Sequence, residues 1–138
     1  MKVATGADTC RNDRCANYAV DVTLTITAPA NAATTMSDNM KGNATYDLPR
    51  GSVKTLVNVY APVGVVPIAV TEDAVAIAHP ATVDELQPVG EITDELAPSQ
   101  TVTVRFEWVD SLPGKREVEP EVTPTNHASQ INVLKVTC

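Results

Sequence analysis

The segment Thr101–Val109, with the sequence TVTVRFEWV, constrains the fold of this chain more than any other stretch. Apolar and polar residues alternate through it, and the only Phe and the only Trp of the chain fall on its apolar side. A two-residue period is typical of a β-strand with one buried and one solvated face. The segment therefore predicts a sheet with Trp108 at the centre of its buried face.

A second segment, residues 18–28 with the sequence YAVDVTLTITA, shows the same alternation and carries threonines on its outer side. Such a face suits a solvated sheet surface. We expect the apolar side of this strand to lie in a facing sheet and to pack against Trp108 through Val20, Val22 and Leu24.

Turn signals divide the rest of the chain into further short strands, which are expected at residues 52–61, 65–70, 74–78, 81–86, 89–96 and 131–137. The segments 65–70 and 74–78 are expected to form a hairpin. Pro67 is expected to place the first of them at a sheet edge or a bulge, because proline cannot donate to a ladder.

Two of these strands carry specific expectations about their neighbours. Asp94 follows Ile92 on one face of 89–96, which suggests an edge strand protected by charge. The turn at Ala97–Gln100 predicts a hairpin between this strand and Thr101–Val109. In 52–61, Leu56 and Tyr60 point away from the apolar side, so that face is expected to be partly covered.

The composition agrees with an all-β domain. Valine and threonine favour strands, and the ten prolines leave little room for helices beyond one turn between residues 34 and 40. We expect an immunoglobulin-like β-sandwich of about 7–9 short antiparallel strands. The 138 residues suit one domain. We expect an N-terminal segment with Cys10 and Cys15 over 1–17 and a single β-sandwich domain over 18–138.

The formal net charge of −7 argues against nucleic-acid partners, which require a basic surface. No apolar run approaches the ~18 residues of a membrane span, and no apolar signal-peptide core follows Met1. We expect no membrane span within this chain.

Three cysteines allow several pairings. A Cys10–Cys15 bridge would close a small loop and contribute roughly 2 kcal/mol, whereas a bridge from either residue to Cys138 would contribute roughly 5 kcal/mol. All three could also be free thiols in a reducing compartment. The placement of Cys138 after the last strand favours the long clamp and an oxidising compartment. The cysteine spacing does not predict a zinc site.

The sequence contains no pattern that predicts catalysis or a cofactor. There is no glycine-rich phosphate loop, and neither His79 nor His127 stands near a nucleophile motif. Neighbouring acids such as Glu72 and Asp73 point to opposite faces of a strand. We expect a non-enzymatic protein without catalytic, cofactor or metal residues. The acidic row Glu117, Glu119 and Glu121 is interpreted as a solvated edge.

Three stretches carry a resemblance to a known family: Val22–Pro29, Thr55–Pro62, and the pattern from Pro88 through Pro98 to Val104. They resemble the C-terminal portion of a family of unknown function found in large exported, membrane-anchored actinobacterial proteins. The usual glycine after Pro98 is Ser99 here. The resemblance implies that Cys10 is the early cysteine of the family and pairs with Cys138. Cys15 has no counterpart in that pattern.

The resemblance also implies a location outside the membrane, with an export signal or anchor outside this sequence. We therefore expect an extracellular, cell-surface module with a structural or interaction role, whose partners are other surface proteins or cell-wall glycans. The alternative is a carbohydrate- or Ca²⁺-binding sandwich. Carbohydrate sites usually present exposed aromatic rings, for which the candidates are Tyr18, Tyr46 and Tyr60.

Overall fold

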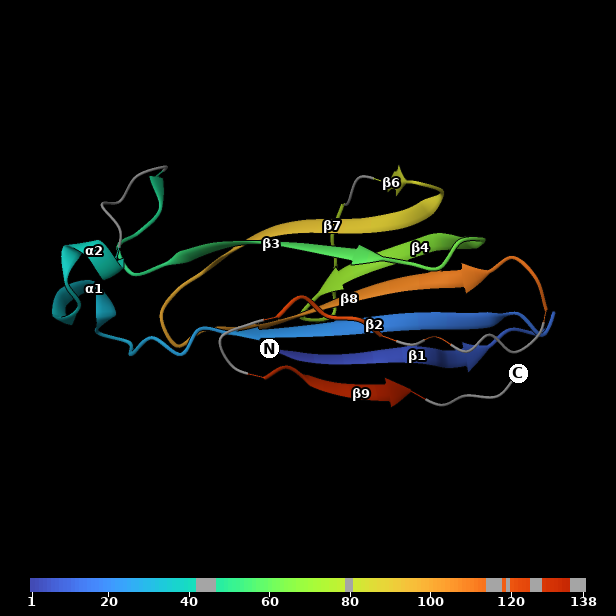
Figure 1. Ribbon diagram of the computed structural model, residues 1–138, viewed down its shortest axis with the longest axis horizontal. Helices are drawn as coiled ribbons and strands as arrows, with labels where there is room; N and C mark the ends of the chain where they lie inside the picture. Colours follow the sequence, from blue (N-terminus) through green and yellow to red (C-terminus); the bar gives the residue numbers. More distant parts are fainter. Residues whose placement is uncertain (42–46, 79–80, 114–117, 119, 125–127, 135–138) are drawn as a thin grey trace.

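The computed structural model describes residues 1–138 except 42–46, 79–80, 114–117, 119, 125–127 and 135–138. The strands of the described part are β1 (Lys2–Cys10), β2 (Ala16–Thr25), β3 (Val53–Tyr60), β4 (Val65–Glu72), β5 (Val75–Ala76), β6 (Ala81–Asp84), β7 (Gln87–Leu96), β8 (Thr101–Asp110) and β9 (Gln130–Leu134). Two short helices, α1 (Ala32–Thr35) and α2 (Asp38–Lys41), lie at one end of the molecule (Figure 1).

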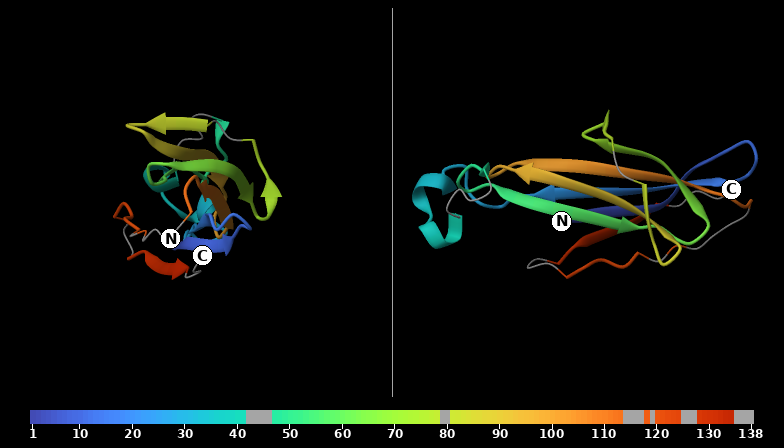
Figure 2. Two further views of the ribbon diagram at one scale, coloured as in Figure 1. Left: turned by 90° about the vertical axis from the view of Figure 1, so that its right-hand side faces the viewer. Right: turned by 90° about the horizontal axis from the view of Figure 1, so that it is seen from above.

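The strands form two sheets. A six-stranded sheet has the order β5-β4-β8-β2-β1-β9, and a three-stranded sheet has the order β3-β7-β6. Seen along the long axis, the smaller sheet lies over one face of the larger one (Figure 2). This confirms the prediction of an all-β sandwich; the immunoglobulin-like arrangement stays a prediction.

The alternation in β8 places its apolar side inward, as predicted. Trp108 is 3% exposed and Phe106 is fully buried, and their rings stack with centroids 5.9 Å apart. The prediction that Trp108 packs across the sandwich against β2 is wrong. Strands β2 and β8 are neighbours in one sheet, with Tyr18 opposite Trp108. Alternation identifies the buried face of a strand, but not the sheet in which its partner lies.

Gly90 of β7 faces Phe106 of β8 from the other sheet. A Cβ atom at this position would lie 2.4 Å from Cδ1 of Phe106, closer than two carbon atoms can approach. The absent side chain therefore leaves the space that the phenyl ring occupies between the two sheets.

Strands β7 and β8 do not form the predicted hairpin. Strand β7 pairs with β3 and with β6, so it is the central strand of its sheet rather than an edge. The turn forms as expected, with the Gln100 N–H donating to the carbonyl of Ala97 (3.1 Å), but it carries the chain from one sheet to the other. A turn signal shows where the chain reverses and leaves open which sheet it enters.

The expectation that residues 1–17 form a segment ahead of the sandwich is also wrong, because part of this segment is a strand of the larger sheet. Strand β1 pairs antiparallel with β2 and parallel with β9. It buries Val3 and Thr5, which are 6% and 4% exposed. Small and hydroxyl-bearing residues dominate this strand, so its apolar alternation is weak in the sequence.

Two expectations about β4 are confirmed. Its register with β8 shifts between Pro67 and Ala69, which is the expected bulge, and it forms a hairpin with β5. The turn between them uses Asp73 and Ala74 at φ values of 44° and 67°. Both residues adopt the left-handed conformation that a two-residue hairpin turn requires, although neither is glycine.

Candidate functional site

Exposed apolar side chains gather in one part of the chain. Twelve large apolar residues of the described segments are strongly exposed: Val53, Leu56, Tyr60, Val63, Val66, Ile68, Val75, Val83, Leu86, Leu112, Ile131 and Val133. Nine of these twelve lie between residues 53 and 86, in the stretch from β3 to the β6–β7 turn. Contiguous apolar patches mark interaction surfaces, whereas single exposed apolar residues are ordinary, so β3, which exposes two large side chains on one face, is the place to look for such a patch.

The strand β3 contributes both an open face and an open edge to this region. Its register with β7 places Lys54, Leu56, Asn58 and Tyr60 on the outer face of the three-stranded sheet. Leu56 is 56% exposed and Tyr60 is 53% exposed. The expectation that this face is partly covered is therefore wrong in the described part of the chain.

Polar groups surround these two side chains. Asn58 lies opposite Glu91 in the β3–β7 ladder, and Lys54 forms an ion pair with Glu95 at 3.5 Å between Nζ and Oε1. The outer face thus alternates apolar and hydrogen-bonding groups along β3.

The opposite, outer face of the six-stranded sheet carries an ion network. The guanidinium of Arg105 donates from Nη1 to both carboxylate oxygens of Asp21 (3.1 Å each) and from Nε to Glu107 (3.0 Å), and Nη2 is paired with Asp8. Asp8 lies on the same face of β1 as Ala4, which is opposite Asp21, and the β1–β2 register shifts between Ala7 and Thr9. The network cross-links β1, β2 and β8, and it uses each guanidinium nitrogen of Arg105.

Two carboxyl groups approach one another between the sheets. Glu72 lies opposite buried Val104 in the β4–β8 ladder, and Asp94 alternates with buried Ile92 and Leu96 in β7, so both are on inner faces. Burial raises the pKa of Glu72, and the carboxylates of Asp94 and Asp73 raise it further. Within the described residues, Oδ2 of Asp94 is buried and has no hydrogen-bond partner.

This carboxyl pair does not form a metal centre. Across the described ranges, no group of three His, Cys, Asp or Glu residues could hold a metal ion.

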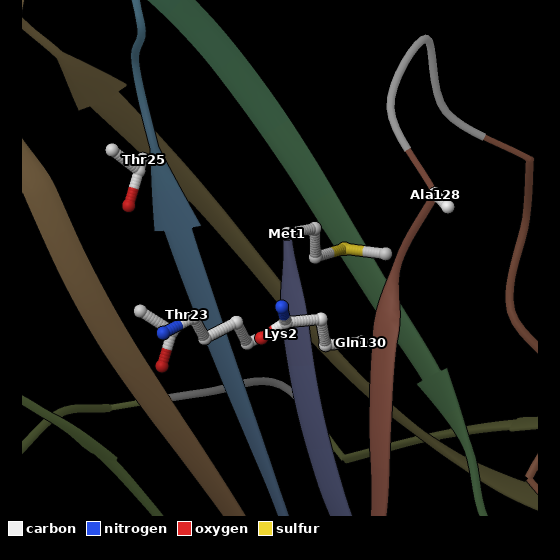
Figure 3. A pocket seen from close by; sticks show the side chains of 6 residues that line it. All are labelled: Met1, Lys2, Thr23, Thr25, Ala128 and Gln130. Atoms are coloured by element: carbon white, nitrogen blue, oxygen red, sulfur yellow. The ribbon is translucent and has the colours of Figure 1, made fainter.

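A shallow hollow of about 210 Å³ lies at one end of the six-stranded sheet. Its lining consists of Met1, Lys2, Thr23, Thr25, Ala128 and Gln130. Figure 3 shows the side chain of Lys2 reaching over Thr23, its partner in the β1–β2 ladder. The hydroxyls of Thr23 and Thr25 already bond those of Thr103 and Thr101, at 3.0 Å each. The lining of the hollow thus contains the cation Lys2 and no carboxylate, whereas Ca²⁺ is bound by oxygen ligands that usually include carboxylates.

The cysteines are only partly described. Cys15 is a free thiol that is 7% exposed, so a Cys10–Cys15 bridge is absent. Burial raises the pKa of Cys15, and the carboxylate of Asp13 adds to the effect. Cys10 lies exposed at the end of β1. Cys138 lies outside the described residues, so the predicted Cys10–Cys138 bridge stays a prediction.

Several other residues singled out in the sequence also lie outside the described part, namely His79, His127, Tyr46, Glu117 and Glu119. Of the remaining tyrosine candidates, Tyr18 is buried in the core and Tyr60 is exposed. No helix of the described chain is long and apolar enough to cross a membrane.

The sequence interpretation missed two features of this region. The open edge of β3 was detectable as eight residues without proline, glycine or acid. Gly90 was detectable as an isolated glycine inside an apolar strand pattern, which signals a close approach of backbone and neighbour.

Comparison with known proteins adds no relative: no family model, no curated protein and no solved structure matches this chain.

Proposed function

We propose that this chain is a non-catalytic β-sandwich module that acts at the outer cell surface in a structural or interaction role. The observation that carries the proposal is the gathering of exposed apolar side chains between residues 53 and 86. Exposed apolar side chains are stabilised when a partner covers them. The resemblance to exported, membrane-anchored actinobacterial proteins supports the location, and other surface proteins or cell-wall glycans are the proposed partners.

The location is tested on the full-length protein in its native host. Intact cells are treated with a protease that cannot enter them, and loss of the domain is followed with an antibody. We expect the domain to be removed while a cytosolic marker stays intact. A domain that is protected in intact cells and degraded only after lysis would contradict the surface location.

A Cys10–Cys138 clamp belongs to this proposal. It is supported by Cys15 being the free thiol among the described cysteines. Protein purified from an oxidising compartment is denatured, alkylated without reductant and weighed. We expect one alkyl group per chain, attached to Cys15. When the protein is reduced before alkylation, we expect three alkyl groups. Three groups without reduction would remove the clamp and weaken the surface assignment.

The second candidate is a carbohydrate-binding module, and the observation that favours it is Tyr60. This ring is 53% exposed on the outer face of β3, next in the alternation to Asn58, which lies opposite Glu91. Stacking on a ring combined with amide and carboxylate hydrogen bonds is suited to a sugar. Cosedimentation with purified cell-wall glycan should then fall at least tenfold in Tyr60→Ala and not in Tyr18→Phe. Equal binding by wild type and Tyr60→Ala would exclude this candidate.

The calcium version of the second candidate has less support, since the described residues hold no cluster of three oxygen ligands of the required kind. A site for Ca²⁺ would raise the melting temperature as the ion is added. An unchanged melting temperature across the titration would remove this version.

A further inference from the structure

We propose that one end of the sandwich docks on a zwitterionic phospholipid surface, into which exposed apolar side chains of three loops insert. The loops are 61–64 between β3 and β4, 85–86 between β6 and β7, and 111–113 after β8. Together they are called the loop end. The inference rests on the proposed location at the outer cell surface and adds a lipid to the proposed partners.

Hydrogen bonds between the loops and strands hold the three loops at the same end of the molecule. The Ala61 N–H donates to the carbonyl of Pro88, at the start of β7, at 2.9 Å. The Ser111 N–H donates to the carbonyl of Gly64 at 3.3 Å, and the Ser111 hydroxyl donates to the same oxygen. In Figure 1 this end lies at the right, away from α1 and α2.

Each loop presents one large apolar side chain to solvent. Val63 is 53% exposed, Leu86 is 77% exposed and Leu112 is 68% exposed. Transfer of such side chains out of water is favourable, and a lipid surface offers an apolar phase that requires no matching shape. The three side chains stand on separate loops rather than along one strand. A protein partner would need a complementary pocket for each of them.

The backbone of the β6–β7 turn holds Leu86 outward in a strained conformation. Asp84 pairs with Gln87, so Glu85 and Leu86 are the two central residues of the turn, with φ values of 46° and 72°. Such turns usually contain Asn-Gly, because a bulky residue is strained at positive φ. Strain of this kind gathers at functional sites. Leu86 therefore combines strain with exposure, and neither stabilises the single chain.

Backbone donors next to the exposed side chains are satisfied within the protein. The Leu112 N–H donates to Oδ1 of Asp110 at 3.2 Å, and the Val65 N–H donates to the carbonyl of Pro62 at 3.4 Å. Pro62 and Pro113 have no N–H to satisfy. An unsatisfied backbone group is costly in lipid. These loops can thus enter the lipid interface without leaving these donors unpaired.

A cation lies at the same end. The β1–β2 turn is there because Asn17, at the start of β2, pairs with Val109, near the end of β8. Arg11 in this turn pairs with Asp13 at 3.0 Å, whereas Arg14 is exposed and forms no ion pair among the described residues. The guanidinium of Arg14 is therefore available to donate to a lipid phosphate.

The balance of charge selects the class of lipid. The β1–β2 turn and the loop end together carry two arginines, Arg11 and Arg14, and two acids, Asp13 and Glu85, and hence no net charge. The whole chain carries −7. An anionic membrane would repel the rest of the chain, whereas a zwitterionic surface would not. The loop end is thus suited to zwitterionic headgroups.

Flotation of the full chain with phosphatidylcholine vesicles tests the proposal. Three side chains give weak binding, so lipid is raised to about 10 mM. We expect the protein to float with the vesicles, and to do so equally at high salt because apolar insertion is not screened. Protein that does not float would overturn the proposal. So would binding that requires anionic lipid and is lost at high salt, which would be charge attraction alone. Neither result affects the surface location, which proteolysis of intact cells tests.

The position of the contact is tested by a pair of asparagine variants. Leu86→Asn removes the apolar side chain, and asparagine tolerates positive φ, so the turn should form at least as well. We expect vesicle binding to fall about tenfold. The matched control is Val75→Asn in β5, which changes a residue that is 67% exposed and should leave binding unchanged. Melting temperatures establish that both variants fold. Binding that survives Leu86→Asn, or that falls equally in Val75→Asn, would overturn the proposal.

Hydrogen exchange on the wild-type chain gives a readout that requires no variant. We expect backbone amides of the loop end to exchange more slowly when vesicles are added, while amides of β5 and β9 do not change. Vesicle-dependent protection elsewhere, without protection of the loop end, would assign the lipid contact to another surface and overturn the proposal.

Discussion

At the scale of single residues, the contact between Gly90 and Phe106 shows how the two sheets fit together at one point. The phenyl ring lies where a side chain at position 90 would begin, and it is fully buried. The sequence shows the alternation that buries Phe106, but not which residue of the second sheet faces it. That information depends on how the sheets stack, and stacking is set by all inner-face side chains together.

We predict that Gly90→Ala lowers the free energy of unfolding by about 1–3 kcal/mol, because the added methyl group overpacks the space held by the Phe106 ring. Urea denaturation measures the change. The control measures Gly90→Ala in a chain that also carries Phe106→Leu. The smaller leucine side chain should reduce the loss of unfolding free energy that the alanine causes. If the alanine costs the same in both backgrounds, the two residues are not coupled.

Glu72 is predicted to make stability depend on pH. Its pKa is raised above the ordinary 4.5 by burial and by Asp94 and Asp73. Well below pH 4.5 the carboxyl is protonated in both folded and unfolded chains, so its folded environment carries no penalty. As the pH rises from 4.5 through the higher folded-state pKa, the partly buried group must ionise and stability is lost.

The variant Glu72→Gln should therefore melt at a higher temperature than wild type at pH 7, and the difference should shrink toward zero below pH 4.5. Glu91→Gln, on the exposed outer face of β7, is the matched control and should show a smaller difference. A Glu72→Gln effect that is equal at both pH values would contradict the assignment.

At the scale of elements, the network around Arg105 holds β1, β2 and β8 together on the outer face of the larger sheet. We predict that Arg105→Gln lowers the free energy of unfolding by roughly 1–2 kcal/mol, because three partly exposed carboxylates lose their shared cation. The loss should be smaller at high salt, which screens repulsion among Asp8, Asp21 and Glu107.

The control for this variant is Lys54→Gln, which removes the exposed pair with Glu95. It should cost less than about 1 kcal/mol by the same urea measurement. An Arg105→Gln variant as stable as Lys54→Gln would show that the network contributes no more than an ordinary surface pair.

The elements also show how far the sequence alone could predict the fold. Period-two alternation found β2 and β8, and turn signals found the β4–β5 hairpin and the Pro67 bulge. Strand β1 was missed because Thr5 is buried among small residues, where side-chain polarity no longer reports burial. The pairing of β7 with β3 was missed because sheet membership is a long-range property, which a turn at Ala97–Gln100 does not encode.

The exposed outer face of β3 was harder to predict from the sequence than the strands themselves. Leu56 and Tyr60 were assigned to the right face of β3, but whether another element covers that face is a long-range property. The described strands form two sheets, and no local pattern in the sequence tells whether a further element lies on the outer face of one of them.

At the scale of the whole molecule, the two sheets should differ in local stability. Strands β2 and β8 are central in the larger sheet and contribute most of the buried core. Strand β6 is a four-residue edge in which Val83 is 67% exposed. We predict the slowest amide exchange in β2 and β8 and much faster exchange in β6, measured by native-state hydrogen exchange at low protein concentration. Equal rates in these strands would contradict the arrangement.

The parallel pairing of β1 with β9 determines how the molecule responds to tension. The five pairs from Lys2↔Gln130 to Gly6↔Leu134 run in one direction, so the start of β1 and the end of β9 lie toward opposite ends of the pair (Figure 1). A pull on these two points slides one strand along the other and loads the ladder hydrogen bonds together, because those bonds run across the strands. Antiparallel terminal strands pulled from one end would open one bond at a time. This topology therefore gives the module a geometry that resists stretching between its first and last strands.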